Sequence, residues 1–238
     1  MKIRVTYLTV FMLNILVSSV YATTFTLLTE ELPPYSIRGN GSETGASIDI
    51  VSQLFERAGF DYEIIIVPWK RAMRMSLSDE NTCIFPMQRN QEREATYHWI
   101  SPILITQTGF YTRKDSPHKL VTIDDAKGLI IGTYNGSAVA EYLTSWGYDV
   151  RITPRDAPNI HKLMKNRIDV WAADTLSAKY LADKHKITNM KEQLVYFSTL
   201  RALACNTKVA EIKVNKLRQE LKLMYTDGTI EAIISKYK

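Results

Sequence analysis

Apolar residues in the first part of the chain follow two periods that alternate. Short β-branched or aromatic runs at 25–29, 62–67 and 82–85 predict strands. Between the first two strands, apolar residues recur at helical spacing over 46–59, and Pro68 stands where a second helix would begin. The order of strand, helix, strand, helix, strand predicts a mostly parallel sheet with helices on both faces.

The later part of the chain repeats this order of elements without repeating the sequence. The expected elements are strands at 129–133, 148–153 and 169–173, and helices at 138–146, 157–166, 174–186, 209–225 and 229–237. Two longer extended runs, about 104–112 and 195–206, lie where the two sets of elements meet. The sequence therefore predicts two α/β units joined by two extended segments.

The first 22 residues have the pattern of a secretory signal peptide. Lys2 and Arg4 precede an apolar stretch at 5–17, and small residues end at Ala22. The alternative is an uncleaved membrane anchor, although the apolar stretch is short for a membrane span. We expect cleavage after residue 22, and export of a mature chain in which no further segment crosses a bilayer.

Charge and metal-ligand patterns argue against two classes of function. The net charge is +5 for the whole chain, and it falls to +3 without Lys2 and Arg4. The basic residues are scattered, whereas nucleic-acid binding usually needs a clustered basic face. The four histidines are dispersed, and the sequence has no CxxC pattern or Cys/His cluster. We therefore expect no nucleic-acid partner, no metal and no cofactor.

The two cysteines, Cys83 and Cys205, both lie in short apolar runs that we interpret as strands. Export makes a disulfide chemically possible. If the two strands are neighbours, a bridge would close a long span of the chain and contribute about 4–5 kcal/mol in the chain-entropy model. The alternative is a pair of buried free thiols, since cysteine is among the most buried residue types.

The stretch 83–107 runs from an apolar strand into a polar turn that holds Gln88, Arg89 and Arg93. In open α/β sheets, ligands bind beyond the carboxyl ends of the strands, so this turn is a candidate ligand site. Within it, Asn90-Gln-Glu-Arg93 is followed by Trp99-Ile-Ser-Pro102. This pattern resembles the T-x-x-R…F-S-x-P motif of periplasmic solute-binding proteins, the family that delivers polar amino acids to ABC importers.

The C-terminal stretch at 221–237, with Asp227-Gly-Thr229, resembles the closing signature of the same family. The resemblance covers nearly the whole mature chain. It implies a type II periplasmic binding protein fold, in which two Rossmann-like α/β lobes are joined by two crossover strands. Carried over, one lobe comprises 23–105 and 200–238, and the other comprises 106–199. A small molecule, an amino acid or related anion, would lie between the lobes of a periplasmic monomer that serves an ABC transporter permease.

The resemblance also assigns the charged groups that would hold a zwitterionic ligand. Arg93 is the candidate cation, because its planar fork can pair both oxygens of a carboxylate. Gly136 and Ser137 form a strand-to-helix turn, where free backbone N–H groups can complete the carboxylate site. Asp174, at the end of the stretch from Arg167, is the candidate partner of the ligand's ammonium. The structural alternatives are a solvated surface arginine, a simple turn with Ser137 as helix cap, and a second helix cap at Asp174.

Two aromatic residues, and two residues that differ from the family pattern, bear on the shape of the expected pocket. Tyr35 and Trp69 follow the first and second strands and could wall the ligand side chain, or could simply belong to the core. The family usually has small hydroxyl residues where this chain has Gln88 and Arg89. This difference leaves room for a dicarboxylate, a short peptide or another anionic metabolite instead of an ordinary α-amino acid.

Two other classes of function remain open from the sequence. The first is an enzyme on the same fold, since some relatives are cyclohexadienyl dehydratases, and fold alone does not decide function. Such an enzyme needs a carboxylate or histidine in the cleft as acid or base, for which Glu30 and Glu31 are the candidates. The second is a sensor input module that acts through a membrane partner. We expect a binding protein without catalytic activity.

Overall fold

The computed structural model of the protein describes residues 24–40 and 42–237. The predicted signal peptide lies outside these residues. Within them, no helix is both long enough and apolar enough to cross a membrane.

Eight strands form one mixed sheet in the order β2-β1-β3-β8-β4-β7-β5-β6. The strands are β1 (Phe25–Thr29), β2 (Tyr62–Ile66), β3 (Thr82–Gln88), β4 (Tyr97–Arg113), β5 (Ile131–Tyr134), β6 (Val150–Thr153), β7 (Val170–Asp174) and β8 (Met190–Asn206). β1 pairs in parallel with β2 and β3, and β5 pairs in parallel with β6 and β7. β4 and β8 are antiparallel to each other and connect the two parallel groups.

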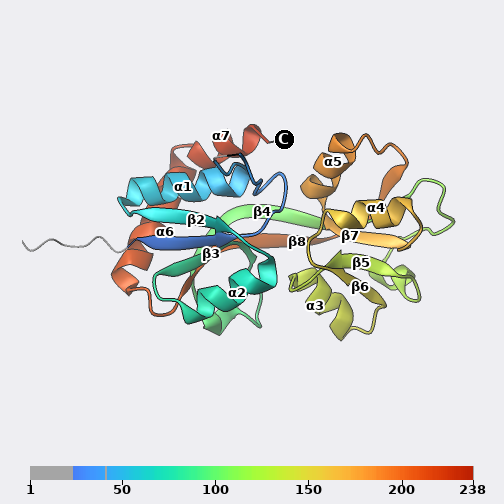
Figure 1. The fold of residues 1–238 in the computed structure, drawn as a ribbon, viewed down its shortest axis with the longest axis horizontal. Coiled ribbons are helices and arrows are strands. Elements are labelled where there is room, and N and C mark those ends of the chain that lie inside the picture. The colour runs from blue at the N-terminus through green and yellow to red at the C-terminus, as the bar shows by residue number, and fades with distance from the viewer. Residues whose placement is uncertain (1–23, 41, 238) are drawn as a thin grey trace, which may run out of the picture.

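Figure 1 shows that the molecule consists of two halves joined by β4 and β8. The first half contains β1–β3 with α1 (Ala46–Ala58), α2 (Trp69–Ser78), α6 (Glu211–Thr226) and α7 (Thr229–Ser235). The second half contains β5–β7 with α3 (Ala138–Ser145), α4 (Pro158–Met164) and α5 (Thr175–Lys184). Two short 3-10 helices, Glu94–Thr96 and Ile123–Ala126, complete the elements. The predicted type II periplasmic binding fold is therefore confirmed, while the residue limits of the two lobes stay a prediction.

Each half buries apolar side chains on both faces of its strands. In the first half, α1, α6 and α7 cover one face and α2 covers the other, so that neighbouring residues of β1 enter different clusters: Leu27 packs under α1 and Leu28 packs under α2. In the second half, α3 covers one face and α4 and α5 cover the other. Successive side chains of a strand point to opposite faces of the sheet, and both faces are buried when a parallel sheet lies between helices.

The helix limits follow local signals in the sequence. The apolar positions of α1 at helical spacing, including Val51, Leu54 and Phe55, are all buried. Gly59 closes this helix with φ 67°, the left-handed conformation that glycine adopts without steric cost. α5 begins at Asp174, whose carboxylate accepts hydrogen bonds from two backbone N–H groups of its first turn.

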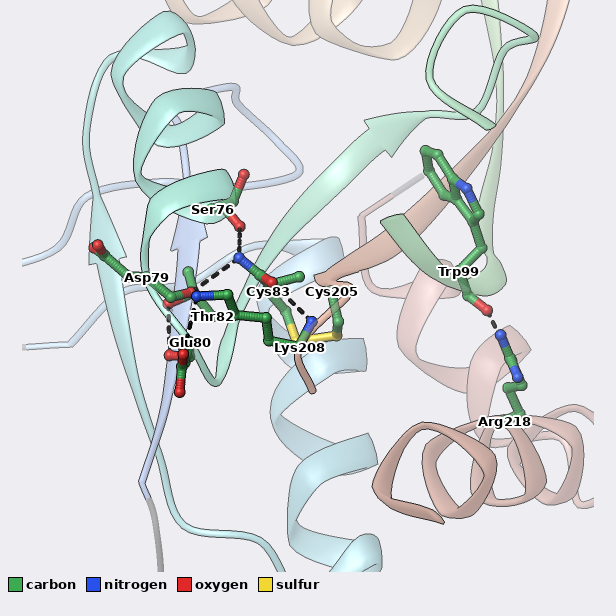
Figure 2. Close-up of a disulfide and its surroundings, with 10 residues drawn as sticks. Ser76, Asp79, Glu80, Thr82, Cys83, Trp99, Cys205, Lys208 and Arg218 are labelled. Carbon is green, nitrogen blue, oxygen red and sulfur yellow. Dashed lines mark hydrogen bonds and ion pairs between the residues drawn. A yellow bond between two sulfur atoms is a disulfide. The ribbon is translucent and has the colours of Figure 1, made fainter. Parts of the chain in front are cut away.

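The predicted disulfide between Cys83 and Cys205 is confirmed, because the two cysteines are direct cross-strand partners of β3 and β8. Figure 2 shows the bridge beside the ion pair between Lys208 and Glu80, whose atoms are 3.0 Å apart. The bridge fixes the pairing of β3 with β8, and the same ladder ends with Gln88 opposite Arg201. The disulfide therefore helps to hold in register two residues that lie at the junction of the halves.

The predicted end of the third strand differs from the observed end, and the difference affects the candidate site. The sequence predicts a strand at 82–85 followed by a polar turn, whereas β3 continues to Gln88. Met87 and Gln88 pair with Ala202 and Arg201 of β8, and every residue of β3 is buried. Gln88 is therefore a buried strand residue, because β8 supplies pairing partners that the polar sequence does not reveal.

Candidate functional site

Arg93 crosses the junction between the two halves. It follows β3 and caps the short 3-10 helix, and it is buried. Its Nη2 donates to the carbonyl oxygen of Gly136 at 3.1 Å and to Oε2 of Glu141 at 2.6 Å. Both acceptors belong to the second half. The alternative of a solvated surface arginine is therefore wrong, and the guanidinium already holds a carboxylate of the protein itself.

Gly136 receives a second donor from the first half. Nε1 of Trp69 donates to the Gly136 carbonyl oxygen at 3.1 Å. Gly136 has φ 77°, and a Cβ built there would lie 3.3 Å from side-chain atoms of Trp69 and Lys70. The left-handed conformation and this close approach together explain why glycine occupies the turn.

Ser137 is the N-cap of α3. Its Oγ accepts from the backbone N of Ala140 at 3.1 Å and donates to the carbonyl oxygen of Tyr134 at 3.0 Å. Its capping role is therefore confirmed, and contact with a ligand stays a prediction. The first N–H groups of α3 have no partner within the helix by geometry, so the turn keeps the capacity to bind an anion.

Asp174 combines a capping role with a contact across the junction. Its Oδ1 accepts from the backbone N of Leu176 and of Ser177, and also from the hydroxyl of Tyr35 at 2.8 Å. Its Oδ2 is buried and has no hydrogen-bond partner among the described residues. The nearest cation is Nη2 of Arg201, at 3.6 Å. Asp174 is thus a helix cap that still has a free acceptor.

The two aromatic candidates are largely core residues with polar tips at the junction. The ring of Tyr35 belongs to the apolar cluster under α1, and the ring of Trp69 belongs to the cluster under α2. Their O–H and N–H groups form hydrogen bonds to the second half, at Asp174 and Gly136. Their role as walls of a ligand pocket stays a prediction.

Arg201 is the central residue that sequence reasoning missed. It lies on β8, is 4% exposed, and donates from Nε to Oγ1 of Thr106 at 3.0 Å and from Nη1 to the carbonyl oxygen of Pro86 at 3.4 Å. Its guanidinium also lies 5.8 Å from the centre of the Tyr35 ring. A possible signal is a single charge inside the otherwise apolar run Leu200-Arg-Ala-Leu-Ala204, read as a buried strand.

Two further buried carboxyl groups act electrostatically on Arg201. Burial raises the pKa of Glu30 to about 8, against the opposing effects of the Arg201 charge and the Tyr134 hydroxyl. Burial also raises the pKa of Asp156 to about 6, although its Oδ1 accepts from Nε1 of Trp171 at 2.9 Å. We call Arg201, Glu30, Asp156 and Asp174 the central charge cluster. It places one guanidinium among three carboxyl groups contributed by both halves.

Two of the spaces between the halves lie at these residues, a small central cavity and a larger side groove. The central cavity has a volume of about 10 Å³, room for about one water molecule, and its lining includes Gln88, Ser137, Asp174 and Arg201. The side groove has a volume of about 510 Å³ and is lined by the 88–92 segment, α3 and residues 197–200 of β8.

The predicted site residues thus separate into neighbouring groups. Gln88, Ser137 and Asp174 share the central cavity, whereas Arg89 lines only the side groove. Nε of Arg89 donates to Glu94 at 2.8 Å, and its guanidinium lies 5.6 Å from the centre of the Trp99 ring. Among residues 24–40 and 42–237, no group of three or more His, Cys, Asp and Glu could hold a metal ion.

Comparison with known proteins relates this geometry to a family. Residues 26–238 match the family described as bacterial extracellular solute-binding proteins, family 3. The chain is 26% identical over 210 residues to the L-cystine-binding protein TcyJ of Escherichia coli (strain K12), and the match covers 86% of this chain and 78% of that relative.

Solved structures share the fold at lower identity. A histidine kinase sensor domain with similarity to periplasmic binding proteins has a TM-score of 0.83 and 20% identity, and the match covers 90% of this chain and 95% of that one. An ancestral arginine-binding protein bound to arginine has a TM-score of 0.81 and 20% identity, with 90% and 97% covered. At this level of identity, the likeness to these structures shows the fold alone.

Proposed function

Because this chain belongs to the bacterial extracellular solute-binding proteins, family 3, we propose that it captures a small polar amino acid or a related anion between its two halves. Closure of two lobes around a solute is a hinge mechanism, and β4 and β8 are the segments that would bend. The proposal includes a periplasmic location, a monomer and delivery of the solute to an ABC transporter permease.

The observation that carries the proposal is the buried Arg93, which bonds a carboxylate across the junction. The Arg93–Glu141 pair has the geometry that a ligand carboxylate needs, with Nη2 and Oε2 2.6 Å apart. The side chain of Glu141 is 33% exposed, so water can solvate it when it leaves. In the proposed mechanism, the ligand carboxylate replaces Glu141 on Arg93, and the N–H groups at the start of α3 assist.

The second charged group of the ligand would bind at Asp174. Its Oδ2 is buried and lies 3.6 Å from Nη2 of Arg201, but it has no hydrogen-bond partner among the described residues, and such an atom normally has one. A ligand ammonium would supply that partner, with Gln88 and Ser137 lining the same cavity. The name of the relative TcyJ, an L-cystine-binding protein, supports an amino acid as the ligand of this chain. Arg89 lies farther out and would contact only the outer part of a ligand.

An enzyme on the same fold is the second candidate, and Glu30 is the observation that favours it. A carboxyl group with a pKa of about 8 is partly protonated at neutral pH and could act as a general acid. However, Glu30 is 2% exposed and does not line the central cavity. Glu31 instead forms a surface ion pair with Arg155 at 3.1 Å. The geometry therefore supports binding better than catalysis. A sensor input module would use the same binding site through a different partner.

A thermal-melt screen of residues 23–238 tests the proposal. The panel contains amino acids, dicarboxylates, polyamines and short peptides, because a ligand at 100 times its Kd stabilises the native state by about 2.7 kcal/mol. We expect an amino acid to raise the melting temperature of the wild type and of the control Arg113→Ala, but not of Arg93→Ala. An equal shift in Arg93→Ala would contradict the site. A shift only with dicarboxylates would remove the ammonium role of Asp174.

A further inference from the structure

The side groove is bounded on one side by a face of α3 that is not packed in the core. Val139, Ala140 and Leu143 are the buried residues of this helix. Ala138, Glu141, Tyr142 and Ser145 lie at the complementary helical spacing and line the groove together with Val139. Its volume of about 510 Å³ is within the range of small-molecule pockets.

Aromatic rings provide the apolar surface of this groove. Tyr142 packs edge-on against Phe197 of β8, with ring centres 4.9 Å apart at an angle of 82°. Trp146, whose ring centre is 6.0 Å from that of Tyr142, is 67% exposed. An exposed tryptophan next to two other rings offers a large, rigid contact area to a bound molecule.

The groove and the central cavity share a wall. Gln88 and Val139 line both spaces, so these side chains form part of the wall between the buried charges and the aromatic surface. A ligand whose first end occupies the central cavity would have its second end directed toward this wall. A ligand longer than a simple amino acid would therefore need the groove.

Charged side chains at the groove match a second zwitterionic group. Arg89 supplies a guanidinium, which forms an exposed ion pair with Glu94 through two hydrogen bonds. Glu141 supplies a carboxylate that becomes available once a ligand carboxylate takes its place on Arg93. The groove then offers the Arg89 cation and the carboxylates of Glu141 and Glu92 beside an apolar surface.

We propose that the side groove is a second subsite for the distal end of a two-ended ligand, a molecule with an amino-acid group at each end of a short apolar linker. This inference rests on the proposed function. The first end binds at Arg93 and Asp174, the linker lies against Tyr142 and Trp146, and the second end pairs with Glu141 and Arg89.

Isothermal titration with matched ligand pairs tests this subsite. The pairs are diaminopimelate with L-norleucine, and L-cystine with S-methyl-L-cysteine; each pairs a two-ended with a one-ended molecule. We expect the wild type to bind the two-ended member of at least one pair about tenfold more tightly. Trp146→Ala should lose most of this preference, and the control Ile212→Ala, an exposed α6 residue, should keep it.

The outcomes separate this inference from the proposed function. Equal affinity for both members of each pair overturns the subsite, as does an equal loss for both members in Trp146→Ala. Binding of L-arginine without binding of either two-ended molecule also overturns it, and leaves the proposed function standing. A wild type that binds no amino acid at all contradicts both.

Discussion

Two arginines contact carboxylates at the junction between the halves, and their surroundings differ. Arg93 holds Glu141 at 2.6 Å, and a third of the Glu141 side chain is exposed. Arg201 lies 3.6 Å from Asp174, and both side chains are at most 5% exposed. The first pair is direct and borders solvent, whereas the second is longer and belongs to a buried cluster with Glu30 and Asp156.

This difference suggests different roles for the two arginines. A carboxylate that water can reach is exchanged at little cost, because solvation compensates for the lost ion pair. A fully buried charge has no such compensation. We therefore assign ligand binding to Arg93 and a structural role to Arg201. The four substitutions below test that contrast, from the largest expected effect to the smallest.

Arg201→Met should destabilise the protein by about 3–5 kcal/mol, because it leaves the buried Asp174 and Asp156 without their cation. Urea denaturation of the mature chain at pH 7 measures the change. Arg113→Met on β4, which removes only an exposed ion pair with Asp115, should change the free energy of unfolding by less than about 1 kcal/mol. Similar small losses in both variants would remove the distinction between the two arginines.

Arg93→Ala should weaken amino-acid binding by at least about a hundredfold, because the ligand carboxylate would then be buried without a cation. The free energy of unfolding should fall by only about 1 kcal/mol, since Glu141 can turn to water. Titration calorimetry and urea denaturation of the same variant measure both quantities. A large loss of stability with unchanged affinity would reverse the assigned roles.

The pH dependence of stability should reveal the central charge cluster. Burial raises the pKa of Glu30 to about 8, so the native state keeps a proton that the unfolded state releases near pH 4.5. The native state therefore binds more protons between these pH values, and stability falls as pH rises through this window. Relative to Glu30→Gln, the wild type should lose about 1 kcal/mol for each pH unit from 5 to 8.

Denaturation at several pH values measures this slope, and Glu31→Gln is the matched control. Glu31 pairs with Arg155 at the surface, so its substitution should leave the pH dependence unchanged. A parallel pH dependence in the wild type and Glu30→Gln would show that Glu30 is ionised in the native protein.

Glu141→Gln should have the smallest effect, and it should strengthen amino-acid binding, whereas Arg93→Ala weakens it. It removes the internal competitor for Arg93, so affinity for a one-ended amino acid should rise by a few fold, within about 1 kcal/mol. Titration calorimetry checks this, with Glu211→Gln in α6 as a control at another exposed ion pair. Weaker binding would mean that Glu141 contacts such a ligand instead of competing with it.

The sequence predicts the fold and the ligand-binding arginine, Arg93, but not the buried Arg201. Alternating strand and helix patterns give the two α/β units, and the family motif directs attention to Arg93 and Asp174. Arg201 was not found in this way, because a single charge in the apolar run at 200–204 does not by itself show whether the strand lies inside the sheet or at its edge. It is buried only because β8 lies between β3 and β4 in the middle of the sheet.

Gln88 and Arg89 are a second case in which the sequence did not show where the side chains lie. The sequence groups them as one polar turn, yet neighbouring residues of an extended chain point to opposite sides. Gln88 lines the central cavity as well as the side groove, whereas Arg89 lines only the side groove. Glu141 was not predicted either, since only the placement of α3 across the junction from the loop after β3 brings it to Arg93.

A crystal structure of the protein with the tightest-binding amino acid tests the central claim most directly. We predict the ligand carboxylate within hydrogen-bond distance of the Arg93 guanidinium, the ligand ammonium on Oδ2 of Asp174, and Glu141 displaced from Arg93. Arg201 should remain in place. A bound ligand with the Arg93–Glu141 pair still intact would contradict the exchange of partners on which the proposed function depends.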